Sequence, residues 1–364
     1  MSGQPLRVWI VPPEGRGPAG EPGPRELADR LRERGVRPEI LDIDPGRNAA
    51  RPGETIRAPG LRRPWLRPLA ARWLAGYRGT DLPDLIHVQG IASADLAIDL
   101  AETLHVPYLL ELADFLTPSG RLRVGRQSCL GLIVPDADLA GDLTRAMGVA
   151  PDRVFLIPPG IPAVDPECAR ACRRVGHLPV IGAAGSAADG PGLAELIEAM
   201  PGILSALGDV ELLIAGNAGD LPGIHERALA RGVAERITYT GGATASALFW
   251  DALAIYCQAP TGPACGVRLA LAMSRGIPAV ASDVPGLRHW IEPGETGRLV
   301  PPGNPGRLAT ALVDLLNDPD EAARLGANAA STIARSCGPD RQADALADLY
   351  RRIVRDPAPR PWSA

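Results

Sequence analysis

The stretch GPACGVRLALAMSRGIPAVASDVPGLRHWIEPGETGRLVPPG, residues 262–303, carries the clearest fold signal in the chain. After Gly266 the apolar residues follow a helical pattern, and PAVAS (278–282) is a short apolar run typical of a buried strand. Turn-forming glycines and prolines follow at 285–286 and 293–297. A helix that leads directly into a buried strand predicts one repeat unit of a parallel sheet covered by helices.

The same alternation of strand and helix extends from this stretch toward the N-terminus. We expect strands at 6–11, 37–44, 84–90, 107–112, 131–135, 153–160, 178–185, 210–216, 237–241 and 254–260, with helices such as 24–35, 93–105 and 137–147 between them. This order predicts an α/β protein with two Rossmann-like, doubly wound domains that face a cleft. Ligands of such sheets bind outside the carboxyl ends of the strands.

One segment interrupts the alternation and predicts the domain boundary. Residues 161–178, IPAVDPECARACRRVGHL, contain two prolines and three arginines and show no strand pattern, so we interpret them as a linker. We expect an N-terminal domain over 1–165 and a C-terminal domain over 166–340. The last helix, within 341–364, is expected to pack back on the first domain.

Composition excludes several classes of protein. The 364 residues have a formal net charge of -4, which argues against a general nucleic-acid binder. The closest cysteines, Cys168 and Cys172, have no second pair at zinc spacing, so no metal site is expected. Cysteines scattered along a chain in this way are typical of reduced thiols. We find neither a signal peptide nor an apolar run long enough to span a membrane. We therefore expect a cytoplasmic protein.

Positive charge is concentrated in residues 47–81. This segment holds eight arginines against two acids, a net of six positive charges, with Trp65, Trp73 and Tyr77 between them. Tryptophan and arginine together on a short amphipathic stretch favour contact with an anionic membrane surface, which would make the protein peripheral at the inner face of the membrane. The alternative is a solvated insertion whose aromatic side chains pack on their own domain.

Several motifs resemble those of the GT-B glycosyltransferases of family 4. In the second half they are IGAAGSAADGPGLAELIEAM (181–200), LLIAGNAG (212–219), ITYTGG (237–242) and the stretch from Ala270 to Gly326. DLIHVQG, HVPYLLELADF and RVFLIPPGIP are weaker matches in the first half. The resemblance covers nearly the whole chain and is strongest over 179–334.

The resemblance implies a retaining, metal-independent transfer of a sugar from a nucleotide sugar to a glycan, lipid or small acceptor, without a cofactor. The positions that match the family's donor site are Gly185, Ser186, Asn217, Thr240, Gly266, Val267 and Arg268. His87 and Gln89 are the candidates for acceptor binding, and Asp114, Glu111 and His87 are the candidates for catalysis. Helix amides and arginine would neutralise the diphosphate, because both stabilise a departing anion.

The chain departs from the family at its charged positions. Ser186 and Pro191 stand where the family has arginine and lysine, Pro263 and Leu271 replace two glutamates, and Ala113 replaces a histidine. Two hypotheses follow: an active transferase that relies on main-chain amides, or a catalytically inactive relative that binds or scaffolds a partner. A third hypothesis is a transferase that uses a lipid-phosphate sugar, with segment 47–81 holding the lipid.

The candidate side chains also have purely structural explanations. His87 and Gln89 could be a hydrogen-bonded pair at the end of a strand, and Arg268 could face solvent on its helix. A lone acid at a strand end, such as Glu111, is often structural.

Overall fold

The computed structural model describes residues 5–13, 23–43, 54–79, 81–112, 122–125, 127–146, 148–164, 178–184, 192–215, 221–241 and 247–355. The chain forms two compact units. Unit 1 comprises Met1–Gly17, Pro22–Gly160 and Pro339–Ala364, and unit 2 comprises Pro18–Glu21 and Ile161–Gly338. The expected boundary between residues 165 and 166 lies outside the described residues.

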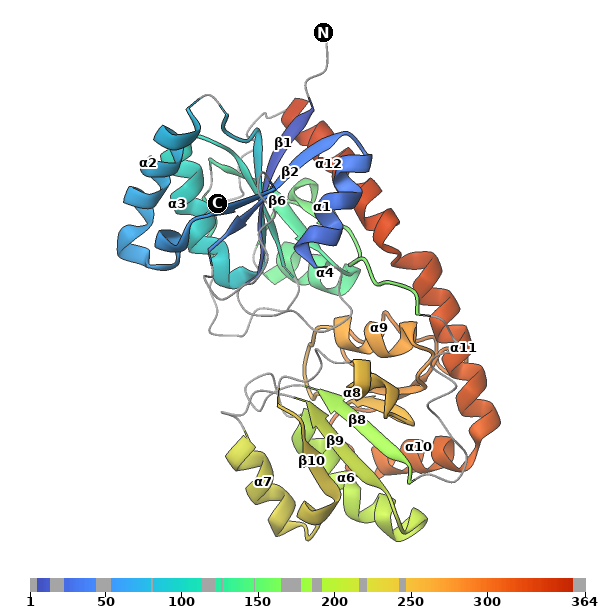
Figure 1. The fold of residues 1–364 in the computed structure, drawn as a ribbon. Coiled ribbons are helices and arrows are strands. Elements are labelled where there is room, and N and C mark those ends of the chain that lie inside the picture. The colour runs from blue at the N-terminus through green and yellow to red at the C-terminus, as the bar shows by residue number, and fades with distance from the viewer. Residues whose placement is uncertain are drawn as a thin grey trace. The chain divides into compact units, whose positions relative to one another are not determined.

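Unit 1 is built on a seven-stranded parallel sheet (Figure 1). In spatial order the strands are β3 (Thr55–Arg57), β2 (Val36–Asp42), β1 (Leu6–Val11), β4 (Leu85–Gln89), β5 (Tyr108–Glu111), β6 (Cys129–Val134) and β7 (Val154–Leu156). The central strands are apolar on both faces, as expected for a parallel sheet covered by helices on both sides.

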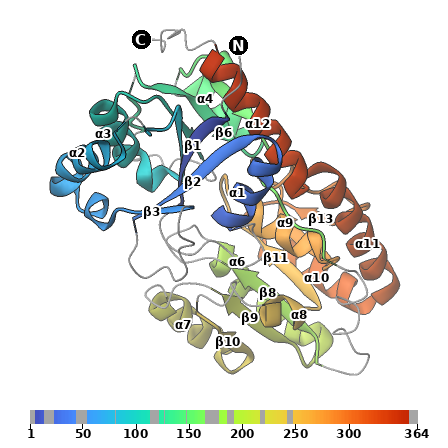
Figure 2. The same ribbon diagram turned by 45° about the horizontal axis from the view of Figure 1, so that its top comes forward.

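Successive side chains of β1 enter two different cores, because strand side chains alternate between faces. Trp9 and Val11 join one core, and Val8 and Ile10 join the other. The first core is covered by α2 (Arg67–Arg78), α3 (Ala94–Leu104) and α4 (Ala137–Ala146), and the second by α1 (Pro24–Glu33) and α12 (Pro339–Arg355). Figure 2 shows α1 and α12 side by side in unit 1.

Unit 2 repeats this plan with six parallel strands. Their spatial order is β10 (Ile237–Tyr239), β9 (Glu211–Ala215), β8 (Val180–Ala184), β11 (Ile255–Gln258), β12 (Ala279–Ser282) and β13 (Arg298–Val300). One face packs against α6 (Gly192–Leu207), α7 (Leu221–Ala230) and α10 (Pro305–Asn317), and the other against α8 (Ala247–Asp251), α9 (Val267–Ser274) and α11 (Pro319–Ser336).

The strand order reverses once in each sheet, and this sets where ligands are expected. The reversal lies between β1 and β4 in unit 1 and between β8 and β11 in unit 2. At such a switch point the connections leave toward opposite faces and open a crevice at the carboxyl ends of the strands. The predicted pair of doubly wound α/β domains is therefore confirmed. None of the described helices is long and apolar enough to cross a bilayer.

Candidate functional site

In unit 2, the connection from β11 to α9 begins at the switch point. Gln258, the last residue of β11, donates a hydrogen bond of 2.8 Å from Nε2 to the carbonyl oxygen of Cys265. This bond ties the end of the strand to the loop just before α9. The other amide atom, Oε1, is buried and accepts no hydrogen bond from the residues that the structure describes. A buried amide oxygen without a donor can accept a hydrogen bond from a ligand.

Gly266 is required by packing as well as by its position at the helix N-cap. A Cβ atom on Gly266 would stand 2.0 Å from Nε1 of Trp290 and 2.7 Å from the carbonyl oxygen of Gly286. Only glycine therefore allows the main chain and the Trp290 indole to approach this closely. The helix that follows starts at Val267, and the amides of its first turn have no acceptors within the helix.

Arg268 lies in the first turn of α9 and is half-buried. Its charge acts on the buried hydroxyl of Tyr256, whose pKa is raised by burial although Arg268 partly opposes the shift. The Tyr256 hydroxyl has no hydrogen-bond partner among the described residues. Leu271, at one position where the family has a glutamate, is fully buried in the core between α9 and the sheet, whereas Pro263 is exposed.

The remaining donor positions are described only in part. Thr240 follows β10 and donates a hydrogen bond of 3.3 Å from its hydroxyl to the carbonyl oxygen of Ile214. Gly185, Ser186 and Asn217 lie outside the described residues. Of the predicted donor site, the structure therefore describes the residue after β10, the end of β11 and the start of α9.

In unit 1, the predicted acceptor residues form a polar cluster within the sheet. His87 is fully buried on β4, and its Nδ1 lies 2.7 Å from the hydroxyl of Tyr350 on α12. Its Nε2 lies 3.1 Å from Oε2 of Glu111, at the end of β5. Gln89 donates a hydrogen bond of 3.0 Å to the same carboxylate.

These contacts keep Glu111 ionised. Burial opposes the charge, but the His87 ring and the Gln89 amide outweigh it, so the pKa of Glu111 lies below its usual value. The Glu111 side chain is 19% exposed. A carboxylate with a lowered pKa is a weak base but a good acceptor of hydroxyl hydrogen bonds. Asp114, the neighbouring candidate, lies outside the described residues.

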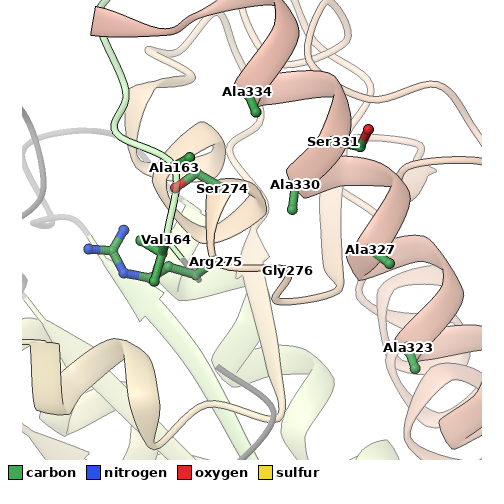
Figure 3. Close-up of a pocket in the computed structure, with 10 residues that line it drawn as sticks. All are labelled: Ala163, Val164, Ser274, Arg275, Gly276, Ala323, Ala327, Ala330, Ser331 and Ala334. Atoms are coloured by element: carbon green, nitrogen blue, oxygen red, sulfur yellow. The ribbon is translucent and has the colours of Figure 1, made fainter. Parts of the chain in front are cut away.

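A hollow of about 270 Å³ lies elsewhere in unit 2, between α11 and the residues that follow α9 (Figure 3). Its lining is mostly alanine from α11 together with Ala163 and Val164. Arg275 points away from these alanines (Figure 3) and stacks over the Trp250 ring at 5.3 Å. Because α9 leaves the carboxyl edge of the sheet, its C-terminal end lies at the opposite edge. The hollow is therefore separate from the switch point.

No group of three or more potential metal ligands occurs among the residues with described positions.

Comparison with known proteins assigns a family to each unit. The model "Glycosyltransferase Family 4" matches residues 24–164, and the model "Glycosyl transferases group 1" matches residues 178–318. The chain belongs to the GT-B glycosyltransferases of family 4. The match to the group 1 model includes β11 and the start of α9.

Sequence identity to characterised proteins supports the same family assignment. A phosphatidyl-myo-inositol mannosyltransferase from Mycobacterium leprae is 38% identical over 131 residues, which are 35% of this chain and 34% of that protein. The chain spans between about a third and two thirds of the length of the first curated relatives that it matches.

Solved structures show the same fold over almost the whole chain. A sucrose-phosphate synthase from Thermosynechococcus elongatus has a TM-score of 0.74 at 20% identity, covering 96% of this chain and 99% of that one. The Anabaena HepE protein, solved in complex with UDP-glucose, has a TM-score of 0.73 at 17% identity and covers 95% and 100%.

Sequence reasoning missed two residues of these clusters. Tyr350 was missed because it is 263 residues from His87, and only the packing of α12 on the sheet joins them. Gln258 was not singled out because it lies inside the expected strand 254–260, whereas β11 ends at Gln258.

Proposed function

We propose that the chain is a retaining glycosyltransferase that moves a sugar from a nucleoside-diphosphate sugar to a glycan, lipid or small-molecule acceptor. The observation that carries the proposal is the start of α9 at the switch point of unit 2. There the first-turn amides, Arg268 and the buried Oε1 of Gln258 lie together at the carboxyl edge. The HepE structure with UDP-glucose supports a nucleotide-sugar donor.

In this proposal the first turn of α9 receives the diphosphate. Breaking the bond between the anomeric carbon and the phosphate oxygen leaves negative charge on the nucleotide. Helix amides carry about half a positive charge at the N-terminus, and Arg268 adds a full one. These groups stabilise the leaving group without a metal ion. Thr240, Gly185, Ser186 and Asn217 remain the proposed contacts to the base, ribose and phosphates.

We assign the acceptor to unit 1. Glu111 accepts a hydrogen bond from the acceptor hydroxyl group and fixes its orientation. His87 is buried between Tyr350 and Glu111, so it acts by orienting the carboxylate, and Gln89 donates a hydrogen bond to the same carboxylate oxygen. Asp114 is the remaining candidate for a catalytic carboxylate. The similarity to the phosphatidyl-myo-inositol mannosyltransferase of Mycobacterium leprae supports a lipid acceptor class.

A cytoplasmic location belongs to the same proposal. Cys257 is a free cysteine buried in the core of unit 2, which supports a reducing compartment.

The test is isothermal calorimetry with UDP-, GDP- and ADP-sugars, followed by a hydrolysis and transfer assay with the sugar that binds. We expect Arg268→Ala to weaken binding roughly tenfold to hundredfold, the value of one charge-assisted contact. Arg307→Ala is the matched control, because Arg307 is an exposed arginine near the start of α10, on the other face of the sheet. Binding without hydrolysis or transfer would favour the inactive relative, and no binding would refute the proposal.

A further inference from the structure

The outer side of α2 and of the turn before it exposes large apolar side chains in one row. Trp65, Leu69, Trp73 and Tyr77 have exposed fractions of 72%, 67%, 58% and 72%. A spacing of four residues places them along the same side of the helix, and we call these four residues the aromatic stripe. Over twelve residues the stripe is about 18 Å long.

The fold does not need the stripe, because α2 is held by its opposite side. Ala71 and Leu74 are buried in the core of unit 1. Arg67 is also buried, where it donates a hydrogen bond of 3.0 Å to the carbonyl oxygen of Leu61 and lies 3.4 Å from Asp99. The alternative that these aromatic side chains pack on their own domain is therefore wrong for Trp65, Trp73 and Tyr77.

The segment that carries the stripe is strongly basic. Residues 55–79 contain no aspartate or glutamate. The exposed arginines of this segment are Arg57, Arg62, Arg63 and Arg72. The Arg63 guanidinium lies 5.9 Å from the centre of the Trp65 ring, and the rings of Trp73 and Tyr77 stack at 5.2 Å. Arg63 thus lies beside the stripe, in a segment that holds no acidic residue.

We propose that the aromatic stripe and its arginines dock the protein on an anionic lipid bilayer, with α2 lying in the plane of the interface. Tryptophan and tyrosine are favoured at the membrane–water interface, and each arginine near an anionic surface strengthens binding about fivefold. A 12-residue helix is too short to span a bilayer, so it lies on the surface.

Charge complementarity selects a lipid surface over a second copy of the chain. A symmetric dimer through this face would bring the arginines of two copies together without any acid in the segment to pair with them. Anionic headgroups supply the missing negative charge. Because membrane docking requires neither donor nor acceptor, it can fail or succeed independently of the proposed transfer reaction.

Vesicle co-sedimentation of the full chain tests the proposal, with phosphatidylcholine vesicles compared with vesicles that also contain phosphatidylglycerol. We expect the wild type to sediment with the anionic vesicles and to be released by salt. Arg63→Gln/Arg72→Gln should weaken binding to anionic vesicles about 25-fold, from two arginines. Arg25→Gln, an exposed arginine on α1, is the matched control and should change binding much less.

A second set of variants tests the apolar part. Trp65→Gln/Trp73→Gln should lower binding at least tenfold and remove the blue shift of tryptophan fluorescence on vesicle addition. Leu229→Gln/Leu248→Gln, at exposed leucines of unit 2, is the control and should bind like the wild type. Circular dichroism checks that each variant folds.

Three results would overturn the proposal. The wild type could stay in the supernatant with anionic vesicles at low salt, or the stripe variant could sediment as well as the wild type. Sedimentation velocity could also reveal a dimer that the stripe variant abolishes, in which case a second copy covers this face.

Discussion

Replacing Tyr350 with phenylalanine should destabilise unit 1, because it removes the partner of a buried ring nitrogen. The Tyr350 hydroxyl lies 2.7 Å from Nδ1 of His87, and both side chains are fully buried. Phenylalanine keeps the edge-on ring contact, with centroids 5.7 Å apart, so little packing is lost. The main cost is that Nδ1 of His87 loses its hydrogen-bond partner where no water can replace it, which lowers the free energy of unfolding by about 1–3 kcal/mol. For a unit of this size, 2 kcal/mol lowers the melting temperature by roughly 4–8 °C.

Tyr256→Phe is the matched control for this prediction. Tyr256 is equally buried, but its hydroxyl has no hydrogen-bond partner among the described residues. The same substitution there removes an unsatisfied polar atom, so it should be neutral or slightly stabilising.

Native-state hydrogen exchange is the assay, because it reports stability strand by strand in a protein whose units can unfold separately. Amides of β4 and β5 should lose protection in Tyr350→Phe, whereas β11 should keep its protection in Tyr256→Phe. Equal effects of the two substitutions would refute the reasoning.

Two further substitutions test the described sites. Gly266→Ala should cost about 1–3 kcal/mol in urea denaturation, because its Cβ would meet the Trp290 indole, while Gly262→Ala, with no atom within 4 Å, should cost much less. Glu111→Gln should lower stability at neutral pH. Since the pKa of Glu111 is lowered on folding, its ionised form stabilises the protein above the unfolded pKa, and this contribution disappears as the pH falls through the folded pKa. Melting temperatures across the acid range should therefore converge for wild type and Glu111→Gln but stay parallel for the exposed control Glu102→Gln.

The sequence predicted the central strands well because their patterns are strong. β4 and β5 fall within the expected runs 84–90 and 107–112, and α4 within 137–147. Two edge strands, β3 and β13, were not predicted. Each has three residues, one of which is an arginine, so no apolar run marks it in the sequence and its partner in the sheet defines it.

The candidate site was predictable to the extent that it follows strand ends. Glu111 was predicted as a site residue from its place at a strand end, where the carboxyl edge of a parallel sheet lies, whereas Arg268 was predicted from the resemblance to the family's donor site. The partners of these residues were not found, because Tyr350 reaches His87 from a distant helix and Trp290 reaches Gly266 across a turn. Such contacts depend on packing and leave no local pattern.

The most direct test of the account asks whether a nucleotide sugar binds at the start of α9. Backbone NMR of labelled protein should be recorded during titration with UDP-, GDP- and ADP-sugars. The account predicts saturable shifts of the Gly266, Val267 and Arg268 amides with at least one of them. No saturable binding, or shifts confined to the alanine-lined hollow beside α11, would contradict it.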